Sequence, residues 1–198
     1  MTNISAGMVK DLRSKTGSGM MDCKKALVES DGDFAKAVDF LRKKGLATAS
    51  KRADRQASQG TIQSYVHLGG KIGSLAEVNC ETDFVAKNED FIAFAKDIAM
   101  QVAASAPISV KKEDVSQDVI DRELSVYKGQ AKEMGKPENI AEKIAEGKLR
   151  KFFEDNCLMN QVFIKDTSKT VEDLLNELIA KTGEKIEIKR FARFEIKG

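Results

Sequence analysis

Residues 77–87 have the sequence Glu-Val-Asn-Cys-Glu-Thr-Asp-Phe-Val-Ala-Lys and join two stretches of different periodicity. Apolar residues alternate before this joint, as in a β-strand, and recur at helical spacing after it. Thr82-Asp83-Phe84-Val85 belongs to neither pattern and places an acid beside two large apolar side chains. Because rigid scaffolds often hold functional side chains at such joints, this segment is the first candidate for a functional site.

The stretch before the joint predicts a β-hairpin. Ile62, Val66 and Leu68 alternate with polar residues, and Gly69-Gly70 is typical of a two-residue turn. The return strand continues with an apolar row on one face: Ile72, Ala76, Val78 and Cys80. His67, the only histidine, adjoins the turn on the polar face. Without a second histidine or a nearby nucleophile, we interpret it as a surface residue rather than a catalytic one.

Helices are predicted after the joint, followed by one final strand. The first helix has apolar residues at i, i+3, i+4, i+7, i+8 and i+11: Phe91, Phe94, Ala95, Ile98, Ala99 and Val102. Later helical patterns occupy residues 116–135, 137–153 and 170–183, and Gly147 is expected to interrupt the second of them. Strands at both ends with helices between them predict an α+β core, in which a small antiparallel sheet of about three strands packs with helices.

The final strand, residues 186–196, carries apolar side chains on both faces. Phe191 projects opposite to a row that the strand alternation places together: Ile186, Ile188, Ala192 and Phe194. Apolar groups on both faces suggest that the second face of the sheet is covered, for instance by another subunit.

Residues 1–45 predict three short helices in a small bundle. Glycine-rich turns separate the apolar runs, and Gly45 is placed to end the third helix. Adjacent helical residues cannot both face a core, so at least one of Met20 and Met21 is expected at the surface, where methionine adapts to a partner. A helix-turn-helix module that binds DNA is an alternative, but acidic residues balance the basic ones in this segment.

Residues 46–60 contain almost no large apolar group and predict a linker, whose first residues favour a helix. The expected domains are therefore a helical bundle at 1–45, a linker at 46–60 and an α+β core at 61–198. The basic cluster of Lys51, Arg52 and Arg55 is interpreted as a solvated face, with a contact to acidic RNA or protein as the alternative.

Composition argues against several classes of function. The net charge is only +2, from 33 basic and 31 acidic residues. Such a small positive charge does not indicate binding of nucleic acid or anionic membranes over a large surface. The three cysteines are widely spaced, so no zinc site or disulfide framework is predicted and a reducing cytosol fits best. No signal-peptide core, membrane-length apolar run or catalytic motif occurs, so a binding function without metal or cofactor is expected.

Two segments resemble bacterial-type elongation factor Ts. One is the joint at residues 77–87, and the other is residues 12–27, Leu-Arg-Ser-Lys-Thr-Gly-Ser-Gly-Met-Met-Asp-Cys-Lys-Lys-Ala-Leu. The resemblance covers the whole chain, including residues 163–166 and 190–195, although Val162 stands where the family often has proline. The chain is similar to the short members, and we expect it to lack the second core subdomain and the coiled-coil insertion of longer ones.

The resemblance implies a guanine nucleotide exchange factor, not an enzyme, that binds the translational GTPase elongation factor Tu and promotes GDP release and GTP exchange. In the family, a ubiquitin-associated-like bundle docks on the GTPase, and the expected contacts here are Arg13, Met20, Met21 and Lys24. The Thr-Asp-Phe-Val segment of the family reaches the nucleotide site and disturbs its magnesium ion, and the matching residues are Thr82, Asp83, Phe84 and Val85. A cytoplasmic protein that dimerises through its sheet, without nucleic acid or membrane partners, is expected.

Two alternatives stay open. From spacing alone, Phe84 is more often a core residue beneath the following helix, seven residues before Phe91, and only the resemblance favours its exposure. For the whole chain, the alternative is a ribosome- or RNA-associated binding module without exchange activity. That module would bind RNA with a steep salt dependence through two basic clusters: Lys51, Arg52, Arg55, Lys148, Arg150 and Lys151.

Overall fold

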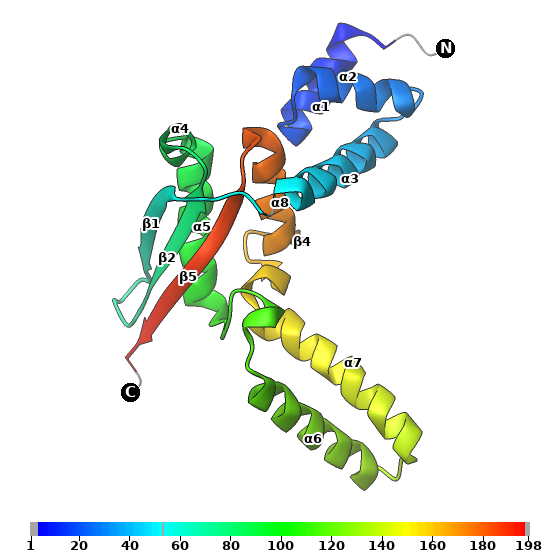
Figure 1. Cartoon of the computed structure of the whole chain (residues 1–198), viewed down its shortest axis with the longest axis vertical. Coiled ribbons are helices and arrows are strands. Elements are labelled where there is room, and N and C mark those ends of the chain that lie inside the picture. Colours follow the sequence, from blue (N-terminus) through cyan, green and yellow to red (C-terminus); the bar gives the residue numbers. More distant parts are fainter. Residues whose placement is uncertain (1–3, 53, 197–198) are drawn as a thin grey trace. The chain divides into compact units, whose positions relative to one another are not determined.

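The computed structural model describes residues 4–52 and 54–196 (Figure 1). The chain forms two compact units, each made of three stretches of sequence. The first unit contains Met1–Thr61, Val78–Phe94 and Asp173–Glu187. The second contains Ile62–Glu77, Ala95–Glu172 and Ile188–Gly198.

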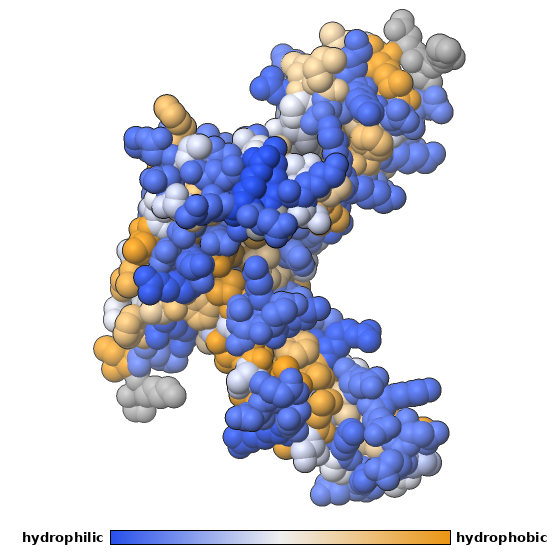
Figure 2. Space-filling model, in the orientation of Figure 1, coloured by the Kyte–Doolittle hydropathy of each residue, from blue (hydrophilic) through white to orange (hydrophobic). Residues whose placement is uncertain are grey.

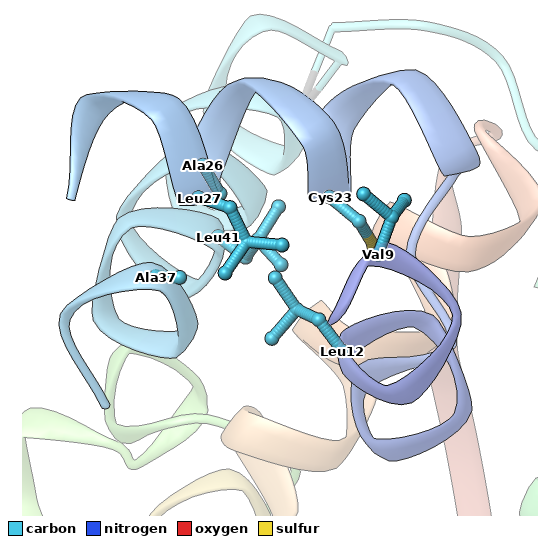
Figure 3. Packing of buried hydrophobic residues seen from close by; sticks show 7 residues of the cluster. All are labelled: Val9, Leu12, Cys23, Ala26, Leu27, Ala37 and Leu41. Atoms are coloured by element: carbon cyan, nitrogen blue, oxygen red, sulfur yellow. The ribbon is translucent and has the colours of Figure 1, made fainter. Parts of the chain in front are cut away.

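The first unit begins with the predicted bundle of three helices, α1 (Ala6–Thr16), α2 (Met20–Glu29) and α3 (Phe34–Arg52). The Ser5 side chain caps α1 by accepting from the Met8 N–H at 3.2 Å, and Gly17 ends this helix with a φ of 66°. One small cluster of buried side chains holds the bundle together (Figure 3): Val9, Leu12, Cys23, Ala26, Leu27, Ala37 and Leu41. The prediction of an N-terminal helical bundle is confirmed.

Gly45 does not end the third helix, and that expectation is wrong. Helix α3 continues to Arg52, through the first residues of the predicted linker. Gly45 is buried, and a Cβ there would lie 3.4 Å from the Cβ of Ala180 in helix α8 (Val171–Thr182). Gly45 therefore lies where α3 packs against α8 within the first unit, not at a helix end.

A three-stranded antiparallel sheet follows, with the strand order β1 (Gln59–Val66), β2 (Ile72–Cys80) and β5 (Ile186–Glu195). The backbone N–H of His67 donates to the carbonyl of Ile72 at 2.8 Å and sets the register of the β1–β2 hairpin. Helix α5 (Glu89–Ser105) covers one sheet face, where the Ser74 hydroxyl donates to the Ala99 carbonyl at 2.5 Å. The predicted α+β class is confirmed.

The opposite sheet face carries a group of exposed apolar side chains. In β2, Ser74 and Ala76 are buried, so Leu75 between them points away from α5. The hairpin register places the exposed residues of β1 on the same side. We call this the open face, and its exposed apolar residues are Ile62, Val66, Leu75 and Phe194. Figure 2 shows apolar surface gathered over these strands.

The side-chain rows of β1 and β5 differ in exposure. The apolar residues Ile62 and Val66 of the predicted alternation are both exposed, because the hairpin register turns the intervening residues toward α5. In β5, Ile188 is buried whereas Phe194 is 65% exposed. Arg193 instead lies on the α5 side, where its Nε donates to the carbonyl of Ala103 at 3.0 Å.

The second unit also contains an antiparallel helical hairpin, formed by α6 (Gln117–Glu133) and α7 (Glu138–Asn156) (Figure 1). Ion pairs such as Lys128–Glu142, at 3.1 Å, connect its two helices. Gly147 lies inside α7 without interrupting it, because one glycine costs a packed helix only about 1 kcal/mol. The expectation that Gly147 interrupts its helix is therefore wrong, whereas the two predicted helices are present and form this hairpin, which we call the arm.

Short elements complete the second unit. They are the 3₁₀ turns at Lys112–Asp114 and Leu158–Asn160, together with the two-stranded ladder of β3 (Val162–Phe163) and β4 (Asp166–Thr170). The buried side chain of Gln161 joins these pieces, since its Nε2 donates to the carbonyl of Asp155 at 2.8 Å and its Oε1 accepts from Gln101 at 3.2 Å. This polar network fixes the base of α7 to the end of α5.

The three cysteines are expected to resist thiol reagents in the native protein. Cys23, Cys80 and Cys157 are free and buried, and burial raises the pKa of Cys80 to about 11. At pH 8 only about one Cys80 in a thousand is then a thiolate, the reactive form. A disulfide-exchange reagent should react fully with the three thiols in denaturant and only slowly without it. Rapid native reaction of Cys80 would contradict the buried position.

Candidate functional site

The joint between strand and helix is a single helical turn, α4 (Asp83–Ala86). Thr82 has an extended backbone and caps this turn, since its hydroxyl oxygen accepts from the Val85 N–H at 3.4 Å. The Thr82 carbonyl accepts from the Ala86 N–H at 3.2 Å. The four candidate residues Thr82 to Val85 therefore form one structured turn.

Phe84 is 82% exposed, so it does not pack beneath the following helix. The core position there is filled by Phe91, which is completely buried in α5. Val85 is half-buried, and α4 contains no buried residue. An aromatic side chain held in solvent on a defined turn is costly to leave uncovered and is typical of a protein-binding element.

Asp83 lies beside Phe84 and is exposed. Its carboxylate accepts a hydrogen bond from the Lys87 ammonium at 2.8 Å, four residues further on. This bond and the lysine charge lower the pKa of Asp83, so the side chain is an anion at neutral pH. The segment therefore offers an aromatic ring and an adjacent carboxylate to a partner.

Glu184, which is distant in the sequence but belongs to the same unit, binds the residue at the start of this turn. One carboxylate oxygen accepts from the Thr82 hydroxyl at 2.6 Å, and the other accepts from the Thr82 N–H at 3.0 Å. The Thr82 carbonyl also accepts from the Cys80 thiol at 3.2 Å. The N–H, carbonyl and hydroxyl groups of Thr82 are therefore all bonded, and we call the two Glu184 bonds the Glu184–Thr82 clamp.

Glu81 ties the same region to neighbouring backbone. Its carboxylate accepts from the Lys185 N–H at 2.6 Å and from the Arg55 guanidinium at 3.2 Å. The Lys185 bond, followed by the Arg55 hydrogen bond and charge, lowers the pKa of Glu81. The Lys185 ammonium in turn donates to the Arg55 carbonyl at 2.7 Å. The sequence predicts neither Glu184 nor Lys185 as a site residue, because strand and helix periodicity carries no signal for contacts between distant side chains.

The candidate residues of the bundle are also exposed. Met20 and Met21 begin α2 with exposed fractions of 46% and 73%, which agrees with the expectation that at least one lies at the surface. Lys24 lies one turn further along α2, and Arg13 lies in the last turn of α1. The turn that joins them packs beside α8, because a Cβ on Gly17 would lie 3.5 Å from the Cδ of Lys181.

Residues 4–52 and 54–196 offer little other chemistry. His67 contacts Tyr65, whose hydroxyl lies 3.1 Å from Nδ1, on the exposed hairpin. Within those residues, no group of three or more potential ligands is arranged to hold a metal ion. No helix in the same part of the chain has the length and apolar character needed to cross a membrane.

Similarity to known proteins defines the class. A family model described as elongation factor TS matches residues 45–197. Elongation factor Ts of Syntrophobacter fumaroxidans is 61% identical over 193 residues, covering 98% of this chain and 96% of that protein. The protein of the same name from Desulfosudis oleivorans is 57% identical over 196 residues, covering 99% of both chains, and that from Geobacter metallireducens is 58% identical over 194 residues, covering 98% and 90%.

These matches place the chain among the translation elongation factors. It belongs to the elongation factor Ts family.

Proposed function

We propose that this protein is a guanine nucleotide exchange factor for elongation factor Tu, and that Thr82 to Val85 act at the nucleotide and magnesium site of that GTPase. The observation that carries the proposal is the exposure of Phe84, whose side chain is 82% exposed. It lies on a turn that Thr82 caps, and the N–H, hydroxyl and carbonyl groups of Thr82 are all hydrogen-bonded. A rigid, exposed aromatic can keep a partner's site open at little entropic cost.

The energetics require no chemical step in this protein. A GTPase holds GDP mainly through its phosphates and magnesium. A factor that binds the nucleotide-free form more tightly must be weakened by the nucleotide in the same ratio, and it thereby promotes release. The Asp83 carboxylate can bond groups that otherwise order the phosphate and metal site, while Phe84 occupies the opened space.

The helical bundle supplies the second contact in this proposal. Arg13, Met20, Met21 and Lys24 are exposed, and flexible methionines adapt well to a partner surface. Docking through the bundle would raise the local concentration of the α4 segment at the GTPase without using it for affinity. We accordingly place the protein in the cytoplasm, where translation takes place.

The direct test is a fluorescent-GDP release assay. Labelled GDP bound to elongation factor Tu is chased with excess unlabelled nucleotide, with and without this protein. A large acceleration that saturates with protein concentration supports the proposal, and an unchanged release rate rejects it.

The RNA-binding alternative is disfavoured, because two of its basic side chains are already paired, Arg55 with Glu81 and Lys151 with Asp155. Salt-dependent RNA retention without GDP release would favour it.

A homodimer formed through the open face is also proposed. Several exposed apolar side chains lie together there, flanked by the Arg190–Glu77 ion pair. Phe194→Glu should shift the protein toward monomer in sedimentation velocity by at least about tenfold in dissociation constant, because it places a charge in the apolar interface. Met134→Glu, at an exposed position in the arm, is the control. A monomer at micromolar concentration for the unaltered protein contradicts the proposal.

A further inference from the structure

The α4 turn is too short to hold its own conformation. Forming the first turn of a helix costs free energy, and a helix of this length adds too few further hydrogen bonds to recover it. The cap bond from the Val85 N–H to the Thr82 hydroxyl is also long, at 3.4 Å. Phe84 makes little use of packing, because most of its surface is in solvent. The orientation of the exposed residues must therefore be set through the backbone at Thr82.

Glu184 is well placed to set it. Gly183 ends α8 in the left-handed conformation, with a φ of 74°, and β5 begins at Ile186. The Glu184 backbone is thus fixed between a helix and a sheet strand, and its side chain is half-buried. Its two hydrogen bonds to Thr82 are charge-assisted, and such bonds are roughly twice as strong as neutral ones.

We infer that Glu184 is a positioning residue for the exchange segment: it holds Thr82 so that Asp83 and Phe84 are presented to the partner in one orientation. The consequence for exchange rests on the proposed function, whereas the effect on the mobility of Phe84 concerns this chain alone. Preorganisation of this kind reduces the ordering cost of inserting the segment. Two residues separated by 102 positions in the sequence therefore act together.

Mobility can be measured without the partner. The chain contains no tryptophan, so Phe84→Trp introduces a single indole fluorophore at the exposed position. Time-resolved anisotropy of this variant is compared with the same variant carrying Glu184→Ala. The fast, nanosecond component should grow about twofold when the Glu184–Thr82 clamp is removed. Glu172→Ala, which removes an exposed carboxylate at the start of α8, should leave it unchanged.

Exchange activity is measured with Phe84 intact. Glu184→Ala should lower the maximal rate of GDP release about tenfold, the effect of losing bonds to a charged group. The half-saturating concentration should change less than about threefold, because the bundle is unaltered. Glu184→Gln keeps one acceptor oxygen, so its maximal rate of GDP release should lie between the rates of the unaltered protein and of Glu184→Ala. Thr82→Val removes the hydroxyl bond of the clamp and keeps the bond from the backbone N–H, so the two substitutions together should cost less than the sum of their separate effects.

The outcomes separate the two proposals. Unchanged anisotropy overturns the inference, and so does altered anisotropy with an unaltered release rate. If Phe84→Ala releases GDP like the unaltered protein, the proposed function fails, but anisotropy still decides whether Glu184 orders the segment. Should Glu184→Ala not fold, Glu184→Gln and Thr82→Val provide the same comparison.

Discussion

Phe84→Ala is expected to lower the rate of GDP release from elongation factor Tu by about thirtyfold at saturating concentration. Truncating a central aromatic in a protein interface typically costs about 2 kcal/mol or more, and about 1.36 kcal/mol corresponds to a tenfold change in rate. Because the side chain is 82% exposed, its removal should change the free energy of unfolding by less than about 0.5 kcal/mol. Activity and stability are thus expected to separate.

The measurement is the fluorescent-GDP chase, run over a range of factor concentrations so that the maximal rate and half-saturation are obtained separately. Asp83→Ala should also slow release, by about tenfold, because it removes the carboxylate beside the ring. Met134→Ala is the matched control, since Met134 is an exposed apolar residue at the end of α6. If Phe84→Ala and Asp83→Ala both accelerate release like the unaltered protein, the proposed role of α4 is wrong.

The exposed position of Phe84 cannot be derived from periodicity. Helical spacing places Phe84 seven residues before Phe91 and favours a buried ring for each. Only Phe91 is buried, because Thr82 begins a separate turn and α5 starts at Glu89. The candidate segment stands out because neither repeat accounts for it, whereas its exposure is expected only from the family resemblance.

The sequence predicts the secondary structure better than the faces and ends of its elements. The alternation in residues 62–68 correctly predicts a strand, yet its apolar row lies on the open face. Alternation gives two faces but does not say which one a helix will cover. Gly45 has the same ambiguity, since glycine suits both a helix end and a close helix crossing, and only the position of Ala180 decides between them.

The contacts that hold the candidate site lie beyond any local pattern. Glu184 follows the glycine that ends α8 and has the sequence context of an ordinary polar loop residue. Glu184 precedes β5 and Thr82 follows β2. Glu184 can therefore accept from Thr82 only when β5 pairs with β2 in the folded sheet. Composition and motifs can identify what binds, whereas the groups that position it require the tertiary fold.

Gly60→Ala is expected to destabilise the protein by about 2–3 kcal/mol. Gly60 falls within the predicted linker, but it lies in β1 with a φ of 156°, and a Cβ there would lie 2.3 Å from the Val78 carbonyl oxygen and 2.8 Å from the Asn79 Cα. Both atoms belong to backbone, so no side-chain rotation relieves the overlap. Strand β1 would have to move away from β2 just before the Thr82 turn.

The size and the sign of this effect are best tested against a second glycine. Gly147 lies inside α7 without a positive φ, and a Cβ there would meet no neighbouring group within 4 Å. Gly147→Ala should therefore stabilise the protein by about 0.5–1 kcal/mol, through helix propensity alone. Urea unfolding of both variants gives the two free energies by the same method. Equal effects would contradict the close approach at Gly60, because the same added methyl group is predicted to act in opposite directions at these two positions.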